Sequence, residues 1–176
     1  MKPPFLLLAQ AHHPGADLHI IHEPVFGSDV FLWRTTDYAT FANAIKRCRE
    51  LFQEEGLDHL FDTPAAGTCQ QLVHKGGTRS SYHIHVTQDP SLPPNLTDST
   101  FMVHEVTHLA DFIMEDVGVA PTEMETRAYL VTFFAGTLFR LWWGPNHDYK
   151  VNATGPNESK AVVAEVLKAL AKEVRK

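Results

Sequence analysis

The stretch DSTFMVHEVTHLADFIM, residues 98–114, decides the fold that this sequence predicts. Apolar residues recur in it at helical spacing, and neither Pro nor Gly interrupts it. Asp98 is a favourable N-cap residue, and Gly118 is a favourable stop. The stretch therefore predicts a helix that begins near Asp98, runs through Met114 and ends around Gly118.

Two histidines of this helix, His104 and His108, are one turn apart. Positions i and i+4 project from nearly the same face, so both imidazoles can bind one ion. Zinc binds neutral imidazole, and a catalytic zinc commonly uses three protein ligands plus water. Glu105 can take a proton from such a water. The motif predicts one Zn²⁺ with Glu105 as general base; the alternative is an ordinary histidine pair beside a solvated glutamate.

A third ligand must come from another element, and the next predicted helix begins beside Pro121 and continues to about Trp143. Glu125 is the preferred candidate, because the small Ala128 one turn later would let the two helices approach closely. Two alternatives stay open. Glu125 and Thr122 also fit a capping box, and Glu123 is a second candidate ligand.

The order of predicted strands and helices along the chain indicates a single α+β domain over residues 1–176. Short apolar runs bounded by Pro, Gly or Asp predict strands, and helical periodicity after Asp37 predicts a helix with Gly56 as its C-terminal cap. We expect a small, mainly antiparallel sheet and about four helices, with the histidine-bearing helix followed by the glutamate-bearing one. The predicted strands are residues 5–9, 18–21 and 30–33 and a hairpin of 69–74 with 81–86; loops are expected at 88–94 and 144–157, and a last helix at 158–174.

These residues resemble gluzincin-like metallopeptidases, in particular the small, mostly uncharacterised ones common in phage and prophage genomes. The likeness rests on residues 104–108, 111–113, 115–118 and 125–130. It implies a zincin-like fold and zinc-dependent hydrolysis of peptide bonds, with His104, His108 and Glu125 as zinc ligands and Glu105 as the base. A zincin-fold protein that binds metal but is catalytically silent, with a regulatory or accessory role, is the alternative.

Four further side chains are candidates for substrate contacts or for support of the ligands. His83 and His85 share one face of a predicted strand, which we expect to be the sheet edge beside the cleft, where one of them would stabilise an oxyanion. The alternative is the polar face of a half-exposed strand. Tyr129 is either a catalytic donor or a buried hydroxyl, and Asp111 either holds a ligand imidazole or Arg127, or is an ordinary surface residue.

Four histidines near the N-terminus could form a second metal site: His12, His13, His19 and His22. Their spacing fits no recognised ligand pattern, so we do not expect such a site. The aromatic residues of the stretch 133–143 recur at helical spacing and are expected in the core.

Charge and composition limit the partners. A formal net charge of −6 gives no reason to expect nucleic acid, so a peptide or protein substrate is the expected partner. The apolar stretch 128–143 is too short and too interrupted to span a bilayer. Two cysteines and the short apolar run at residues 5–9 favour a cytoplasmic protein over a secreted one. The oligomeric state stays open.

Overall fold

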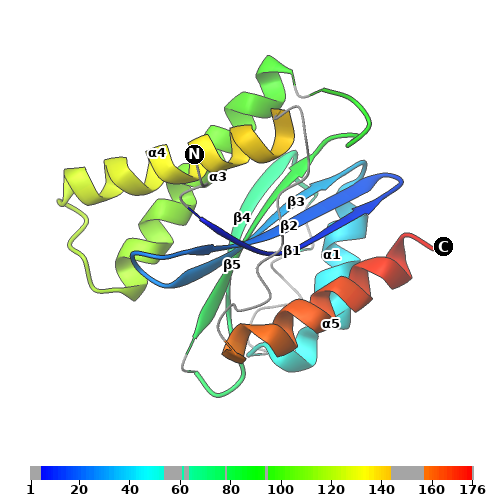
Figure 1. The fold of residues 1–176 in the computed structure, drawn as a ribbon, viewed down its shortest axis with the longest axis horizontal. Helices are drawn as coiled ribbons and strands as arrows, with labels where there is room; N and C mark the ends of the chain where they lie inside the picture. The colour runs from blue at the N-terminus through cyan, green and yellow to red at the C-terminus, as the bar shows by residue number, and fades with distance from the viewer. Residues whose placement is uncertain are drawn as a thin grey trace.

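A five-stranded mixed sheet forms the centre of the computed structural model, which describes residues 5–53, 61, 64–77, 79–93, 95–143 and 157–175 (Figure 1). The strand order is β1-β2-β3-β5-β4, and neighbours are antiparallel except for β3 and β5, which are parallel. The strands are β1 (Leu6–His13), β2 (Ala16–Glu23), β3 (Ser28–Thr35), β4 (Gly67–Val73) and β5 (Ser80–Thr87).

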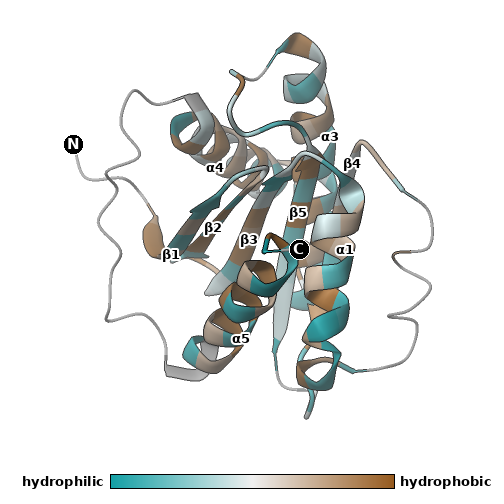
Figure 2. Ribbon diagram, turned by 90° about the vertical axis from the view of Figure 1, so that its right-hand side faces the viewer, coloured by the Kyte–Doolittle hydropathy of each residue, from teal (hydrophilic) through white to brown (hydrophobic). Residues whose placement is uncertain are grey.

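Helices cover both faces of this sheet. On one face lie α3 (Leu96–Asp116) and α4 (Met124–Trp143), and on the other lie α1 (Tyr38–Arg47) and α5 (Asn157–Glu173) (Figures 1 and 2). A short 3₁₀ helix, η1 (Arg49–Leu51), follows α1. Figure 2 shows both hydrophobic and hydrophilic stretches on α1 and α5, as expected for helices with one buried side. The described part of the chain is thus an α+β domain.

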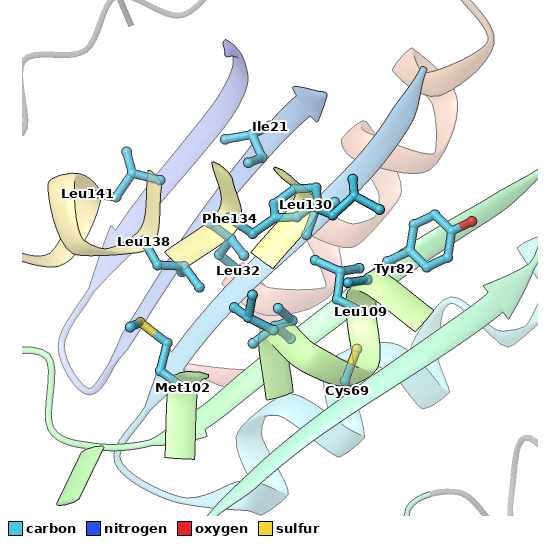
Figure 3. Close-up of a cluster of buried hydrophobic side chains, with 14 of the residues drawn as sticks. Ile21, Leu32, Cys69, Tyr82, Met102, Leu109, Leu130, Phe134, Leu138 and Leu141 are labelled. Carbon is cyan, nitrogen blue, oxygen red and sulfur yellow. The ribbon is translucent and has the colours of Figure 1, made fainter. Parts of the chain in front are cut away.

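The sheet separates two hydrophobic cores, because β2 and β3 alternate apolar side chains between its faces. Figure 3 shows the core on the α3 and α4 side, where side chains from both helices meet the sheet. Its labelled members are Ile21, Leu32, Cys69, Tyr82, Met102, Leu109, Leu130, Phe134, Leu138 and Leu141. The second core, between the sheet, α1 and α5, contains Trp33, Phe41, Ile45, Val166 and Leu170.

Every predicted strand and helix has a counterpart, but several boundaries differ. The first three strands are longer than predicted, because their ladders continue through polar residues such as His12 and Asp17. The first helix is shorter, since α1 ends at Arg47 and Phe52 pairs with His74 beside the sheet. The predicted cap Gly56 and most of the predicted loop 144–157 lie outside the described residues.

None of the helices within the described ranges is both long and apolar enough to cross a bilayer.

Candidate metal centre on helix α3

Helix α3 begins with a reciprocal capping box. Asn95 is the N-cap and its side chain accepts from the Asp98 amide at 3.0 Å, while the Asp98 carboxylate accepts from the Asn95 amide at 3.1 Å. The prediction that Asp98 is the N-cap was therefore wrong by one helical turn, because Asp98 occupies the third helical position instead. The helix packs Met102, Val106 and Leu109 against the sheet, which leaves the histidines on its outer side.

His104 and His108 are brought together on this outer side. Their Nε2 atoms are 3.1 Å apart, the ring centroids are 4.7 Å apart, and both side chains are exposed. Two nitrogens that each bind one tetrahedral zinc at 2.0–2.1 Å would lie about 3.3–3.4 Å apart. The pair therefore fits a shared zinc ion with a movement of a few tenths of an ångström.

Glu105 turns from the same helix toward the sheet edge, and only 7% of it is exposed. It crosses strand β4 at Gly67: a Cβ atom on Gly67 would lie 3.2 Å from both Cγ and Oε1 of Glu105. Burial raises the pKa of Glu105, while positive charge on His104 and His108 and a hydrogen bond from the Cys69 backbone amide oppose that rise. The carboxylate thus lies between the histidine pair and β4.

The edge strand beside this helix is β4, not the strand that was predicted. β5 lies inside the sheet, between β3 and β4, because β3 pairs with it in parallel. The prediction that His83 and His85 lie on the edge strand was wrong. Both are fully buried on the face covered by α1, with the sheet between them and α3, so the structure does not bring them to the His104–His108 pair.

Buried aromatic rings surround these two histidines. His83 stacks on Phe31 at a centroid distance of 4.4 Å, and His85 stacks on Phe41 at 4.6 Å. Burial lowers the pKa of each to about 3, so both are neutral near pH 7. The alternative prediction, a half-exposed polar face, was also wrong, since neither residue is exposed.

Glu125 lies in the first turn of α4 and is exposed, beside Ala128, Tyr129 and Thr132. Within the described ranges, no three His, Cys, Asp or Glu side chains are grouped closely enough to hold a metal ion, so Glu125 is not brought to the histidine pair. Ala128 is exposed as well. Glu123 precedes α4 and is exposed, and α4 begins at Met124, one residue later than a capping box on Thr122 requires.

Tyr129 is directed to the turn between β2 and β3. Its hydroxyl donates to Oε1 of Glu23 at 3.2 Å, and that buried carboxylate also accepts from the amides of Val25 and Phe26. Burial raises the pKa of Tyr129, and the neighbouring Glu23 adds to the rise. Tyr129 therefore ties α4 to the turn between β2 and β3.

Asp111 holds Arg127 rather than an imidazole. The Arg127 Nε and Nη2 atoms donate to the two Asp111 carboxylate oxygens at 2.7 and 3.0 Å, which joins α3 to α4. The guanidinium lowers the pKa of Asp111, and the charge of His108 contributes less to that shift. Asp111 thus lies near His108 and anchors the neighbouring helix.

The N-terminal histidines pair with carboxylates on the sheet. His12 Nδ1 lies 3.0 Å from Asp17 Oδ1, and His22 Nδ1 lies 2.8 Å from Asp29 Oδ1. Neither pair belongs to a group of three candidate ligands in the part of the chain that the structure describes.

Sequence reasoning missed the contribution of β4 to the site. Gly67 and the Cys69 amide approach Glu105, yet they are more than 30 residues away in the sequence. The available signal was a glycine at the start of a strand, which often marks a close approach by another group. No family model, curated protein or solved structure compared with the chain matches it.

Proposed function

We propose that this protein is a zincin-like metallopeptidase that hydrolyses peptide bonds with one zinc ion. The observation that carries the proposal is the 3.1 Å separation of the His104 and His108 Nε2 atoms, with Glu105 next to the first histidine. When bound, zinc would polarise the scissile carbonyl and lower the pKa of a bound water. His104 and His108 would hold the ion, and Glu105 would accept the proton from that water.

The neighbouring sheet edge supports a peptide or protein as the substrate. An extended segment can add to an exposed edge strand through main-chain hydrogen bonds, and β4 is the edge strand that packs against α3. Both cysteines are free thiols, which fits a reducing compartment such as the cytoplasm.

The third ligand in this proposal is Glu125, with Glu123 as the second candidate. Both carboxylates are exposed at the start of α4, and the Asp111–Arg127 pair holds that end of α4 beside α3. An exposed glutamate can change its rotamer at low cost, so both side chains can adapt to an incoming ion. Zinc binding would thus complete the site from the second helix.

Replacing Glu105 by Gln separates an enzyme from a catalytically silent metal-binding protein. We expect Glu105→Gln to keep one zinc per chain while hydrolysis of fluorescein-labelled casein falls at least about 100-fold, because a positioned base contributes roughly that much. Glu115→Gln, a change at an exposed glutamate of the same helix, is the matched control and should keep full activity. Zinc affinities of Glu125→Gln and Glu123→Gln, measured in the same series, identify the third ligand.

Two results decide against this proposal. A wild-type protein that binds zinc but does not cleave casein favours the silent regulatory alternative. Equal activity of wild type and Glu105→Gln contradicts the role of Glu105.

A further inference from the structure

Strand β4 presents alternate backbone groups to its free edge. The Ala66 carbonyl accepts from the Thr87 amide, and the His74 amide donates to the Arg79 carbonyl, each at 2.8 Å. Hydrogen-bonded and non-hydrogen-bonded pairs alternate along an antiparallel ladder, so the even-numbered residues of β4 bond to β5. The amides of Gly67, Cys69 and Gln71 therefore point away from β5.

One bond at the same edge agrees with this alternation. The Val73 carbonyl, two residues beyond Gln71, accepts from the Gln53 amide at 2.9 Å. Backbone groups of odd-numbered β4 residues are thus available to partners outside the sheet. The Cys69 amide points to the edge where Glu105 lies, and its proximity lowers the pKa of that carboxyl group.

Glu105 reaches this edge across the one residue of β4 that has no side chain. A Cβ atom at position 67 would lie 3.2 Å from Cγ and Oε1 of Glu105 and 3.4 Å from Cβ of Phe101. The two 3.2 Å distances are tighter than ordinary Cβ contacts, so a methyl group there would shift the Glu105 side chain by a few tenths of an ångström. Gly67 is not among the glycines with a positive φ, so alanine could adopt its backbone conformation. The reason for glycine at this position is the limited space beside Glu105.

We propose that Gly67 and the Cys69 backbone amide are positioning elements for Glu105: they hold its carboxylate at the β4 edge, beside the histidine pair. A fixed carboxylate loses less freedom when it accepts a proton than a freely rotating one, and its direction is set by a rigid strand. The role of Glu105 as a general base rests on the proposed function, whereas the position of its carboxylate does not.

Amide hydrogen exchange of the metal-free protein tests the placement without any reference to catalysis. We expect the Cys69 amide to exchange about tenfold faster in Glu105→Ala than in the wild type, because the variant removes its acceptor. Gly67→Ala should accelerate the same amide. The Gln71 amide points to the same edge and is the internal control, with unchanged exchange in both variants. Unchanged exchange at Cys69 in both variants would overturn the proposal.

Kinetics test the consequence for the reaction. We expect Gly67→Ala to lower kcat for labelled casein roughly tenfold, with KM and zinc affinity unchanged, because the base moves while the ligands do not. Gly136→Ala is the matched control, since a Cβ atom there meets nothing within 4 Å, and it should keep the wild-type kcat. A wild-type kcat in Gly67→Ala would overturn the positioning role. A wild type without activity overturns the proposed function instead, and hydrogen exchange then decides the placement alone.

Discussion

Two pairs of histidines in this chain occupy contrasting environments. His104 and His108 are exposed on α3, where their nitrogens are close enough to share an ion. His83 and His85 are buried in an aromatic core, where each ring is a neutral hydrogen-bonding group. Burial therefore separates the histidines that are accessible to a metal ion from those that belong to the core.

The hydrogen bonds of the buried pair define their protonation. Trp33 Nε1 donates to His83 Nδ1 at 3.2 Å, so the ring proton of neutral His83 lies on Nε2 and is donated to Ser81 Oγ at 3.1 Å. Thr35 donates its hydroxyl proton to the Asp37 carbonyl, and its oxygen accepts from His85 Nε2 at 2.8 Å. A second proton on either ring would have no acceptor in these contacts.

Stability should consequently fall at acidic pH. Each buried histidine has a pKa near 3 in the folded state and an ordinary pKa near 6.5 when unfolded. The unfolded chain binds more protons between these values, so the stabilisation is complete above pH 6.5 and is lost as pH falls toward 3. At pH 5 each histidine should lower the free energy of unfolding by about 2 kcal/mol relative to pH 7.5.

Urea unfolding at pH 5 and pH 7.5 measures this effect. His85→Leu should lose about half of the pH-dependent difference, because one of the two groups no longer titrates. An identical pH dependence in the wild type and in His85→Leu would contradict the assignment.

Much of the site at this scale follows from local sequence. The spacing of His104 and His108 on one helix determines that they meet, and Glu105 is fixed to the same helix. The position of Glu125 relative to this pair depends on the rotation of α4 about its own axis. The number of residues between His108 and Glu125 does not define that rotation. The environments of His83 and Tyr129 depend on strand order and on Glu23, more than 100 residues from Tyr129, and so could not be predicted from spacing.

At the scale of elements, α3 is defined by its N-terminus and by its buried face. The capping box of Asn95 and Asp98 satisfies two backbone amides, and the Ser99 hydroxyl donates to the Asn95 carbonyl at 2.6 Å. The sequence prediction of this helix was correct in its existence and its apolar face, and wrong in its first residue. Both Asn95 and Asp98 are good N-cap residues, so residue preference alone did not distinguish them.

The cap predicts a specific order of stabilities. Asn95→Ala should lower the free energy of unfolding by about 1 kcal/mol, whereas Asn95→Gly should lower it by only a few tenths, because glycine tolerates the N-cap conformation. Urea denaturation followed by circular dichroism measures both. Equal stability of the two variants would contradict the assignment of Asn95 as the N-cap.

Strand order is the element-scale feature that sequence patterns did not reveal. The hairpin of β4 and β5 was predicted correctly, but which strand joins the rest of the sheet depends on the parallel pairing of β3 with β5. That pairing connects residues about 50 positions apart, and β3 carries apolar residues on both of its faces. The consequence is that β4 forms the edge beside α3.

At the scale of the whole molecule, one sheet serves two cores. Residues of β3 face α3 and α4 on one side and α1 and α5 on the other, so neither helix layer is independent of the sheet. The candidate metal centre lies outside the first of these cores, on the outer side of α3. The fold therefore supports the site through the packing of α3 rather than through the ligands themselves.

Shared burial predicts that the described domain unfolds as one unit. Phe134→Ala and Phe41→Ala each remove a fully buried ring, from opposite cores, and each should lower the free energy of unfolding by about 3–5 kcal/mol. Far-ultraviolet circular dichroism and tryptophan fluorescence should report the same transition in both variants. Two separated transitions would contradict a single cooperative domain.

The central claim is that His104 and His108 hold one zinc ion, and zinc titration of metal-free protein by calorimetry tests it most directly. We predict one zinc per chain for the wild type, loss of that binding in His104→Ala and in His108→Ala, and its retention in His12→Ala, a change at another partly exposed histidine. No zinc binding by the wild type, or full binding by the double variant His104→Ala/His108→Ala, would contradict the account.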